Sequence, residues 1–440
     1  MKKILFISPT REWLRMKHKG DKPKGTLFLR LPSLAAPTLA ALTPKEYEFA
    51  YIDEQVDFLD FDEQADLVAI ICNTSTANRA YEIADEFKKR NIPVIIGGVH
   101  PTLNYDEARS HGIAVSGPAE PVWEEILNDF ENGNLKELYH GNYTKFHFAT
   151  PDRRIFKNKP YAFTAMVETS RGCIHHCNFC STASSFSGKF FTKNISEVID
   201  EIKSLDSKFI MFVDDNIIGN PEHAKKLFQA LIPLKIKWGS ETTYLMGLNE
   251  ELLDLAAKSG CVGVFVGFEA VSDKTLEAYD KGFGRLSLYR KAIDNFHKKG
   301  IMIQGSFIFG SDNDNIETFD QTFKFIEENE IDGVFLGVTT PLPQTPLFNK
   351  LKEENRITDY DWDKYDYKHC VFSPKQMTKA ELVKGMSRIH RKFFRLDRII
   401  FRLLKRFPTL VKRGSLHIFL AYYLMSLSRL KLLRSLRQLS

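Results

Sequence analysis

Three cysteines within eight residues are the part of this sequence best suited to chemistry. Cys173, Cys177 and Cys180 follow the spacing C-x3-C-x2-C. A closed tetrahedral zinc site, or a 4Fe-4S cluster bound only by protein, needs four ligands, so three thiolates leave one coordination position open. Catalytic metal sites keep such a position for the molecule on which they act. The triplet therefore predicts a 4Fe-4S cluster with one iron free to bind a small chelating molecule.

A zinc knuckle is the alternative for the same loop, with His175 or His176 as the fourth ligand. The paired C-x2-C halves typical of zinc sites are missing, which favours the cluster. Phe179, directly before the third cysteine, would shield a cluster from water and so influence its potential. Residues 165–168 read as a buried strand, and sites of open α/β sheets and barrels lie just beyond such strands.

Polar side chains close several strand-like runs that follow the cysteines. The candidates are Asp214, Asp215, Glu241, Glu269 and Gln304. Because a carboxylate beside an amine favours the charged form of both, Asp214 or Asp215 suits a cationic amine, and Glu269 suits a ligand hydroxyl or the substrate. A solvated strand end or a helix cap is the alternative for each residue alone, but together they predict one polar edge.

The elements that must position these residues alternate between strands and helices. Strand-like runs cover residues 163–167, 209–213, 236–238, 262–268, 302–309 and 333–338. A complete eight-fold barrel takes about 250 residues, more than this segment offers. We therefore expect a partial β/α barrel over residues 161–350.

An earlier set of strands and helices predicts a second α/β domain over residues 1–125, a doubly wound parallel sheet. Its ligands would bind beyond the carboxyl ends of the strands, in loops that are small and polar. The residues expected to line this site are Thr10, Thr74, Ser75, Gly97, Gly98, His100, Gly117 and Glu120. We expect His100 to fix its loop through a hydrogen bond rather than to bind a metal.

Residues 126–160 read as a linker, and residues 351–440 as a helical, basic C-terminal region. From residue 381 onward the chain has fifteen Lys or Arg residues against two acids. A basic amphipathic helix is typical of contact with a membrane surface or a partner. The alternative is a helical cap on the barrel with its arginines solvated outward. Nucleic acid is not expected, because the basic residues alternate with aliphatic ones.

Overall composition fits a cytoplasmic protein, with peripheral membrane contact as an option. The 440 residues carry a net charge of +5, and six cysteines do not form a dense disulfide framework. The apolar run near the N-terminus is too short for a signal peptide, and no run reaches the roughly 18 apolar residues of a spanning helix. Cys72 and Cys261 read as core residues, whereas Cys370 is a candidate radical quencher or proton donor.

The cysteine triplet with an aromatic residue before its last member resembles the radical S-adenosylmethionine (SAM) superfamily. By that resemblance, Cys173, Cys177 and Cys180 hold the cluster, and the amine and carboxylate of SAM chelate the fourth iron. Asp214 or Asp215 then stands where relatives hold the methionyl amine. The resemblance also implies a 5'-deoxyadenosyl radical that abstracts hydrogen from a substrate, and an electron donor such as flavodoxin or ferredoxin.

The N-terminal domain is similar to the cobalamin-binding domains of this superfamily in LPSLAAPTLAALTP, DLVAI, GGVHPTL and GPAE. The usual signature D-x-H-x-x-G is absent, so the resemblance implies cobalamin held without a lower-face histidine from this domain. A degenerate domain that binds no cobalamin is the alternative.

Within the superfamily, FVDDN, SGCVGVFVGFE, FIFG, TTPLPQTPL and DWDKYD resemble the branch that contains the hopanoid methylase. This implies cobalamin-dependent C-methylation of an unactivated carbon in a lipid-like or natural-product substrate. The alternatives are a radical SAM cyclase, rearrangement or C–C bond-forming enzyme, or a zinc- or cobalamin-binding sensor at a membrane. A methylthiotransferase is disfavoured because no second cysteine triplet is present.

Overall fold

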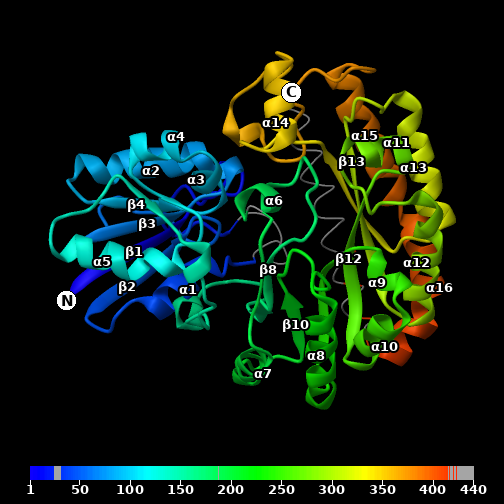
Figure 1. Ribbon diagram of the computed structural model, residues 1–440, viewed down its shortest axis with the longest axis horizontal. Coiled ribbons are helices and arrows are strands. Elements are labelled where there is room, and N and C mark those ends of the chain that lie inside the picture. The colour runs from blue at the N-terminus through cyan, green and yellow to red at the C-terminus, as the bar shows by residue number, and fades with distance from the viewer. Residues whose placement is uncertain (24–30, 187, 415, 417–419, 421–422, 424–440) are drawn as a thin grey trace. The chain divides into compact units, whose positions relative to one another are not determined.

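The protein forms two compact units in the computed structural model, which describes residues 1–23, 31–186, 188–414, 416, 420 and 423 (Figure 1). The N-terminal unit contains residues 1–164 together with the short segments 342–344 and 360–366. The C-terminal unit contains residues 165–341, 345–359 and the chain from 367 onward.

A six-stranded parallel sheet forms the centre of the N-terminal unit, in the order β2-β1-β3-β4-β5-β6. The strands are β1 (Lys2–Ser8), β2 (Tyr47–Asp53), β3 (Leu67–Ile71), β4 (Val94–Gly97), β5 (Ile113–Ser116) and β6 (Leu138–His140). Residues 4–7 of β1 are fully buried, as expected for a central parallel strand covered on both faces. The strand order reverses at β1, so the expected doubly wound sheet is confirmed.

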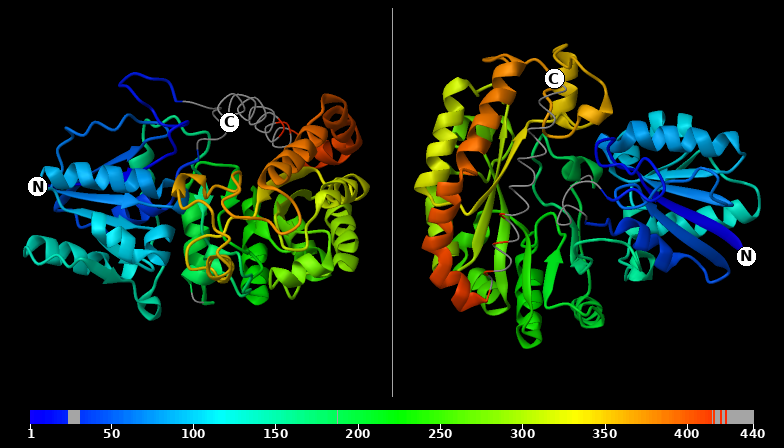
Figure 2. Two further views of the ribbon diagram at one scale, coloured as in Figure 1. Left: turned by 90° about the horizontal axis from the view of Figure 1, so that it is seen from above. Right: turned by 180° about the vertical axis from the view of Figure 1, so that it is seen from behind.

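Helices cover both faces of this sheet (Figure 2). The helices α1 (Ala35–Leu42) and α5 (Trp123–Glu131) pack together on one face, and α2 (Ala77–Lys89) packs against α4 (Tyr105–His111) on the other. The short helix α3 (Val99–Leu103) begins just after β4. The sixth strand lies inside the segment for which the sequence predicts a linker.

The C-terminal unit contains a second six-stranded parallel sheet, in the order β14-β13-β12-β11-β10-β7. Its strands are β7 (Met166–Val167), β10 (Phe209–Phe212), β11 (Lys237–Thr242), β12 (Cys261–Glu269), β13 (Met302–Phe309) and β14 (Gly333–Val338). The helices that connect them include α7 (Ile195–Ser204), α8 (Pro221–Leu231), α10 (Glu250–Lys258), α12 (Leu286–Lys298) and α13 (Ile316–Glu328). This is the partial β/α barrel that the spacing predicts.

The two faces of β12 have different partners. The ring of Phe268 packs on Tyr289 of α12 at 4.9 Å and on Phe325 of α13 at 6.3 Å between centroids. Because side chains alternate along a strand, residues 263, 265, 267 and 269 face away from the helices, and all four are partly exposed. This second face is the interior of the half-barrel.

A short pair of antiparallel strands flanks the cysteine loop. Strand β8 (Ser170–Gly172) pairs antiparallel with β9 (Phe190–Thr192), and α6 (Ser181–Ser185) follows the third cysteine. Gly172 has φ +88°, and a Cβ there would lie 2.2 Å from the carbonyl oxygen of Lys189. Only glycine fits this position, so Gly172 sets the direction in which the loop leaves β8.

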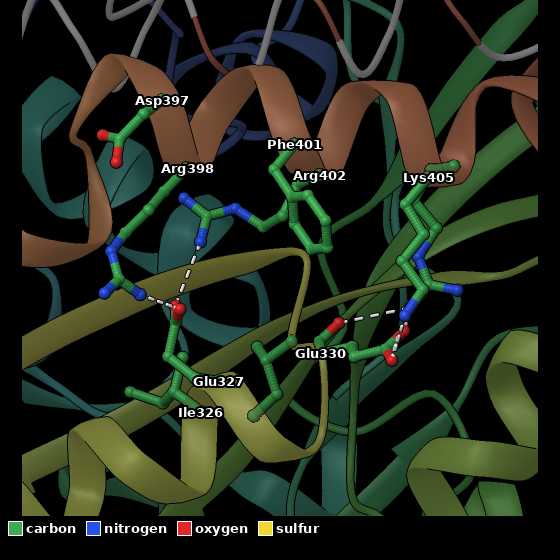
Figure 3. A pocket seen from close by; sticks show the side chains of 10 residues that line it. Ile326, Glu327, Glu330, Asp397, Arg398, Phe401, Arg402 and Lys405 are labelled. Carbon is green, nitrogen blue, oxygen red and sulfur yellow. Dashed lines mark hydrogen bonds and ion pairs between the residues drawn. The ribbon is translucent and has the colours of Figure 1, made fainter.

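Three helices end the described chain: α14 (Pro346–Glu353), α15 (Lys379–Phe393) and α16 (Leu396–Arg413). Helix α16 runs along the outside of α12 and α13 (Figures 1 and 2). Its basic side chains point inward: Arg398 and Arg402 bind Glu327, and Lys405 binds Glu330 (Figure 3). The alternative of a helical cap is therefore right in placing α16 on the barrel, but its arginines are not solvated outward, because Glu327 and Asp332 pair with them.

The opposite face of α16 is apolar and open to solvent. Its side chains with at least half of their surface exposed are Leu396, Ile400, Leu404, Phe407 and Val411. They recur at helical spacing, so they form one stripe, which we call the α16 apolar face. Phe401 is also exposed, but it lines the pocket beside the basic side chains (Figure 3). Within the described part of the chain, no helix combines the length and apolar character needed to cross a membrane.

Candidate active site

The three cysteines lie on one loop between β8 and α6. Cys177 is buried, whereas Cys173 and Cys180 are partly exposed. The amide of Cys180 donates to the carbonyl of Cys177 at 3.1 Å, so the last two thiols share a tight turn. Burial raises the pKa of all three thiols, that of Cys177 to about 12, so a bound metal would have to displace these protons.

Aromatic side chains hold the cysteine loop in place. Phe179 packs edge-on against Tyr279 at 5.1 Å between centroids, and the hydroxyl of Tyr279 lies 2.6 Å from that of Thr339. Asn178 donates to the carbonyl of Ala278 at 2.8 Å and adds a second anchor. Phe179 is itself part of the cysteine loop, next to Cys180. Its role in shielding a cluster from water stays a prediction.

The donor set suits a 4Fe-4S cluster. Within the described ranges, no three His, Cys, Asp or Glu side chains converge closely enough for a single metal ion. A cubane needs no such convergence, because each thiolate binds a different iron. His175, a ligand in the zinc alternative, stacks on Phe283 at 3.8 Å between ring centroids.

Two adjacent carboxylates connect the cysteine loop to the end of β10. Oδ1 of Asp214 accepts hydrogen bonds from the hydroxyls of Thr169 at 2.8 Å and Ser170 at 2.6 Å. Its Oδ2 is buried and has no hydrogen-bond partner in the described structure. Asp215 accepts from the amide of Gly172 at 3.1 Å and from the hydroxyl of Thr182 at 2.9 Å.

Burial raises the pKa of both carboxyls, that of Asp214 to about 7, although the hydroxyls of Ser170 and Thr169 oppose this shift. An incoming cationic amine would lower the pKa of either carboxyl, and Asp215 is the one of the two that is exposed to such a ligand. The geometry therefore fits the role that the sequence predicts for this pair.

A buried lysine that the sequence reasoning missed lies beside Glu269. Nζ of Lys281 is 3.3 Å from Oε1 of Glu269, and its side chain is 5% exposed. The cation stabilises the thiolate form of Cys173 and Cys177, and burial opposes that effect. Gly267 leaves room for the pair, since a Cβ there would lie 2.4 Å from the Glu269 carboxylate. A lone Lys twelve residues past the end of β12 carried no pattern that could have revealed this role.

The other polar residues of the half-barrel share its interior face. The hydroxyl of Ser306 donates to Glu269 at 3.3 Å, and Gln304 lies two residues earlier on the same side of β13. Glu241 is exposed at the end of β11, and partial desolvation together with the nearby carboxylates of Asp215 and Glu269 raises its pKa. The sheet thus places the predicted strand-end residues around one polar edge.

In the N-terminal unit, the predicted ligand loops all follow the carboxyl ends of strands. The amide of Thr10 donates to Glu54 at 3.2 Å, and the hydroxyl of Thr74 is buried without a hydrogen-bond partner in the described chain. Gly98 has φ +120°, and a Cβ there would lie 2.5 Å from the carbonyl of Cys72. Of the remaining predicted positions, Gly97 is the last residue of β4. Ser75 follows β3, and Gly117 and Glu120 follow β5.

His100 is not available to a ligand from outside. Its side chain is fully buried, with its ring 5.1 Å from Trp362 and 6.0 Å from Tyr81 between centroids, and its Nε2 3.6 Å from Glu107. Cobalamin would therefore have to bind here without this imidazole on cobalt. The small, glycine-bearing loops otherwise fit the close approach of a flat macrocycle.

The remaining cysteines take no part in the described sites. Cys72 and Cys261 are fully buried, which confirms the expectation of core positions. Cys370 is partly exposed, and its thiol donates to the carbonyl of Phe372 at 3.2 Å.

Comparison with known proteins assigns both units. Residues 167–326 match the radical SAM superfamily, and residues 25–127 match the B12 binding domain. Bacteriochlorophyllide d C-12(1)-methyltransferase of Chlorobaculum tepidum is 31% identical over 416 residues, covering 89% of each chain. Hopanoid C-2 methylase of Rhodopseudomonas palustris is 22% identical over 353 residues, covering 75% of this chain and 66% of that one. The structure of OxsB with aqua-cobalamin and SAM superposes with a TM-score of 0.66 at 16% identity, covering 100% of this chain and 75% of that one.

These matches and the two sites define a class: radical SAM enzymes with a cobalamin-binding domain. The chain belongs to this superfamily, in the group that contains cobalamin-dependent C-methyltransferases. Its cofactors are accordingly a 4Fe-4S cluster, SAM and cobalamin, which supply one-electron cleavage of a sulfonium and a transferable methyl group. The non-enzymatic sensor is thereby set aside.

Proposed function

We propose that this enzyme methylates an unactivated carbon of a large, mostly apolar substrate bound in the interior of the half-barrel. The supporting observation is the lining of that interior. The rings of Phe265 and Phe335 lie 6.1 Å apart, and Phe335 lies 6.3 Å from Tyr367. These side chains are only partly buried and face the same side as Glu269. Aromatic surface of this kind stabilises an apolar ligand and excludes water from a radical reaction.

The charged residues would hold SAM at one end of this apolar surface. We assign Asp215, which is exposed at the carboxyl end of β10, to the methionyl amine. The buried Asp214 would hold the neighbouring strand through the hydroxyls of Thr169 and Ser170.

Lys281 is assigned to the methionyl carboxylate, because it is a buried cation whose charge lowers the pKa of the thiols of Cys173 and Cys177 against the effect of burial. Glu269 would then exchange its contact with Lys281 for a ligand hydroxyl. Partners of opposite charge at the amine and at the carboxylate would orient the sulfonium for cleavage.

Two kinds of substrate share the required chemistry. Relatives named for bacteriochlorophyllide and hopanoid methylation point to an alkyl carbon on a tetrapyrrole or on a polycyclic lipid. We favour the tetrapyrrole, because the bacteriochlorophyllide relative is the more similar of the two and matches this chain over 89% of its length.

The reconstituted enzyme, with SAM, cobalamin and a chemical reductant, tests this proposal. Bacteriochlorophyllide d and a hopanoid are offered separately, and products are followed by mass spectrometry. We expect a 14 Da increase in the tetrapyrrole with deoxyadenosine formed in step. Methylation of the hopanoid alone would reassign the substrate, and a cyclised product without added mass would favour the cyclase alternative.

We further propose two partners. A flavodoxin or ferredoxin would reduce the cluster, since the described chain has only one set of cluster ligands and needs an external electron.

The α16 apolar face would rest on a membrane surface, where an apolar substrate concentrates. Residues 415–440 of the sequence add four Lys or Arg residues and no acid, which supports an anionic lipid surface as the occupant.

A further inference from the structure

A segment that follows the barrel in the sequence folds as part of the N-terminal unit. It consists of residues 360–366, YDWDKYD, and we call it the 360–366 segment. Its centre is a single turn, η7 (Trp362–Lys364). Trp362 and Tyr365 are buried, and their rings meet edge-on at 4.7 Å. The sequence shows this motif only as a family resemblance, and the proposed function does not use it.

Trp362 anchors the segment to the elements that follow β4. Its Nε1 donates to both carboxylate oxygens of Glu107, at 2.9 and 3.1 Å. Its ring packs edge-on against that of His100, two residues past Gly98. Both ring nitrogens of His100 have no hydrogen-bond partner within 3.5 Å in the described structure. Ring packing and the contact of Nε2 with Glu107 at 3.6 Å therefore fix this imidazole.

Two aspartates anchor the segment to the loops after β1 and β3. Oδ2 of Asp366 lies 3.3 Å from the Arg11 guanidinium, which also donates to the hydroxyl of Ser75 at 2.9 Å. Oδ1 of Asp361 accepts from the side-chain amide of Asn78 at 2.8 Å, in the first turn of α2. Asp366 is buried, so its pairing with Arg11 is shielded from water.

The segment therefore touches the loops after β1, β3 and β4, all at the carboxyl edge of the sheet. In doubly wound sheets this edge receives the ligand, and the strand order here reverses at β1. Without the segment, Arg11, Glu107 and the ring of His100 would each lose a partner.

We propose that the 360–366 segment is a structural part of the cobalamin site, in which Trp362 and Asp366 act as positioning residues. The inference rests on cobalamin binding by this unit. In it, residues 360–366, which follow the barrel in the sequence, hold the ligand loops of the N-terminal unit in their conformation. Loops that are ordered before binding pay less conformational entropy when the ligand arrives. The segment thereby raises affinity for the corrin without contacting its reactive atom.

The test compares three full-length variants titrated with hydroxocobalamin and followed by absorbance. Trp362→Phe keeps the ring and loses the hydrogen bond, and Asp366→Asn removes the charge opposite Arg11. Trp123→Phe is the matched control, because Trp123 is a buried tryptophan of the same unit that donates to Thr43 at 3.0 Å. We expect the first two changes to raise the Kd for hydroxocobalamin about tenfold, and the control to leave it within about twofold.

Amide hydrogen exchange of residues 97–107 in the cobalamin-free protein gives a second readout. Faster exchange in Trp362→Phe than in Trp123→Phe is expected. Equal exchange and equal Kd in the two variants would overturn the proposal. Tighter cobalamin binding by Trp362→Phe would also overturn it, because the segment would then compete with the corrin. If the wild-type protein bound no cobalamin, the cofactor assignment itself would fail, and the exchange experiment would still decide the role of the segment.

Discussion

Nζ of Lys281 lies 3.3 Å from Oε1 of Glu269, and both side chains are largely removed from water. The lysine comes from the loop after α11 (Asp273–Ala278), and the glutamate ends β12 with a φ of +67°. A left-handed backbone at a residue other than glycine is uncommon and clusters at functional sites. This pair places a buried cation and a buried anion where their charges act on the thiols of the cysteine loop.

Replacing Lys281 tests its assignment to the carboxylate of SAM. Lys281→Met should weaken SAM binding by about 10- to 100-fold, because it removes a charged hydrogen bond, while iron content stays unchanged. Lys281→Arg should recover part of the loss. Binding is measured by isothermal titration with the reconstituted enzyme.

The matched control for this change is Lys193→Met. Lys193 is also a buried lysine, paired with Glu201 at 2.5 Å in the same unit. We expect it to lower stability and leave the affinity for SAM unchanged. Equal losses of affinity in both variants would show that Lys281 acts through folding alone.

Single replacements of Cys173, Cys177 or Cys180 by alanine should abolish deoxyadenosine formation and lower the bound iron. Three protein ligands leave one of the four irons open. Without one of these thiolates, two irons would have no protein ligand, and the cluster would be destabilised. Cys261→Ala, which alters a fully buried cysteine of the same unit, should retain both. Full activity in any variant of the triplet would contradict the cluster assignment.

Stability without SAM should depend on pH through Asp214. Burial raises the pKa of this carboxyl from 3.8 to about 7 in the folded protein. The folded state therefore keeps a proton that the unfolded state releases above pH 4. The contribution of Asp214 is present below about pH 4 and is lost as the pH rises through 7, so the free energy of unfolding falls across this window.

Urea unfolding of wild type and Asp214→Asn between pH 5 and 8 measures this effect. Because asparagine stays neutral, the variant should gain roughly 2–4 kcal/mol relative to wild type over the range. A difference that does not change with pH would mean that Asp214 is ionised throughout.

Membrane contact by the α16 apolar face is tested by Leu404→Glu and Phe407→Glu. Each change places a charge among the exposed apolar side chains, so binding to anionic phospholipid vesicles should fall about tenfold in a flotation assay. Ile316→Glu is the control, since Ile316 is similarly exposed at the start of α13. If all three variants lost vesicle binding equally, the binding would be non-specific adsorption and the α16 apolar face would not be the contact surface.

Much of the architecture could be predicted from short-range patterns. Parallel strands buried on both faces appear as apolar runs, and their regular alternation with amphipathic helices yields both sheets. The cysteine ligands were equally visible, because all three lie in one loop and their spacing alone limits what they can bind.

The sequence by itself determined the class of chemistry and the order of the two units. Only the tertiary structure decided that Lys281 lies beside Glu269, that the arginines of α16 point inward, and that Trp362 belongs to the N-terminal unit. Each of these depends on a partner far away in the chain, or on which of two helix faces finds an acid. Local periodicity predicts that α16 has an apolar and a basic face. Pairing of the arginines with acidic residues of the barrel decides that the basic face turns inward.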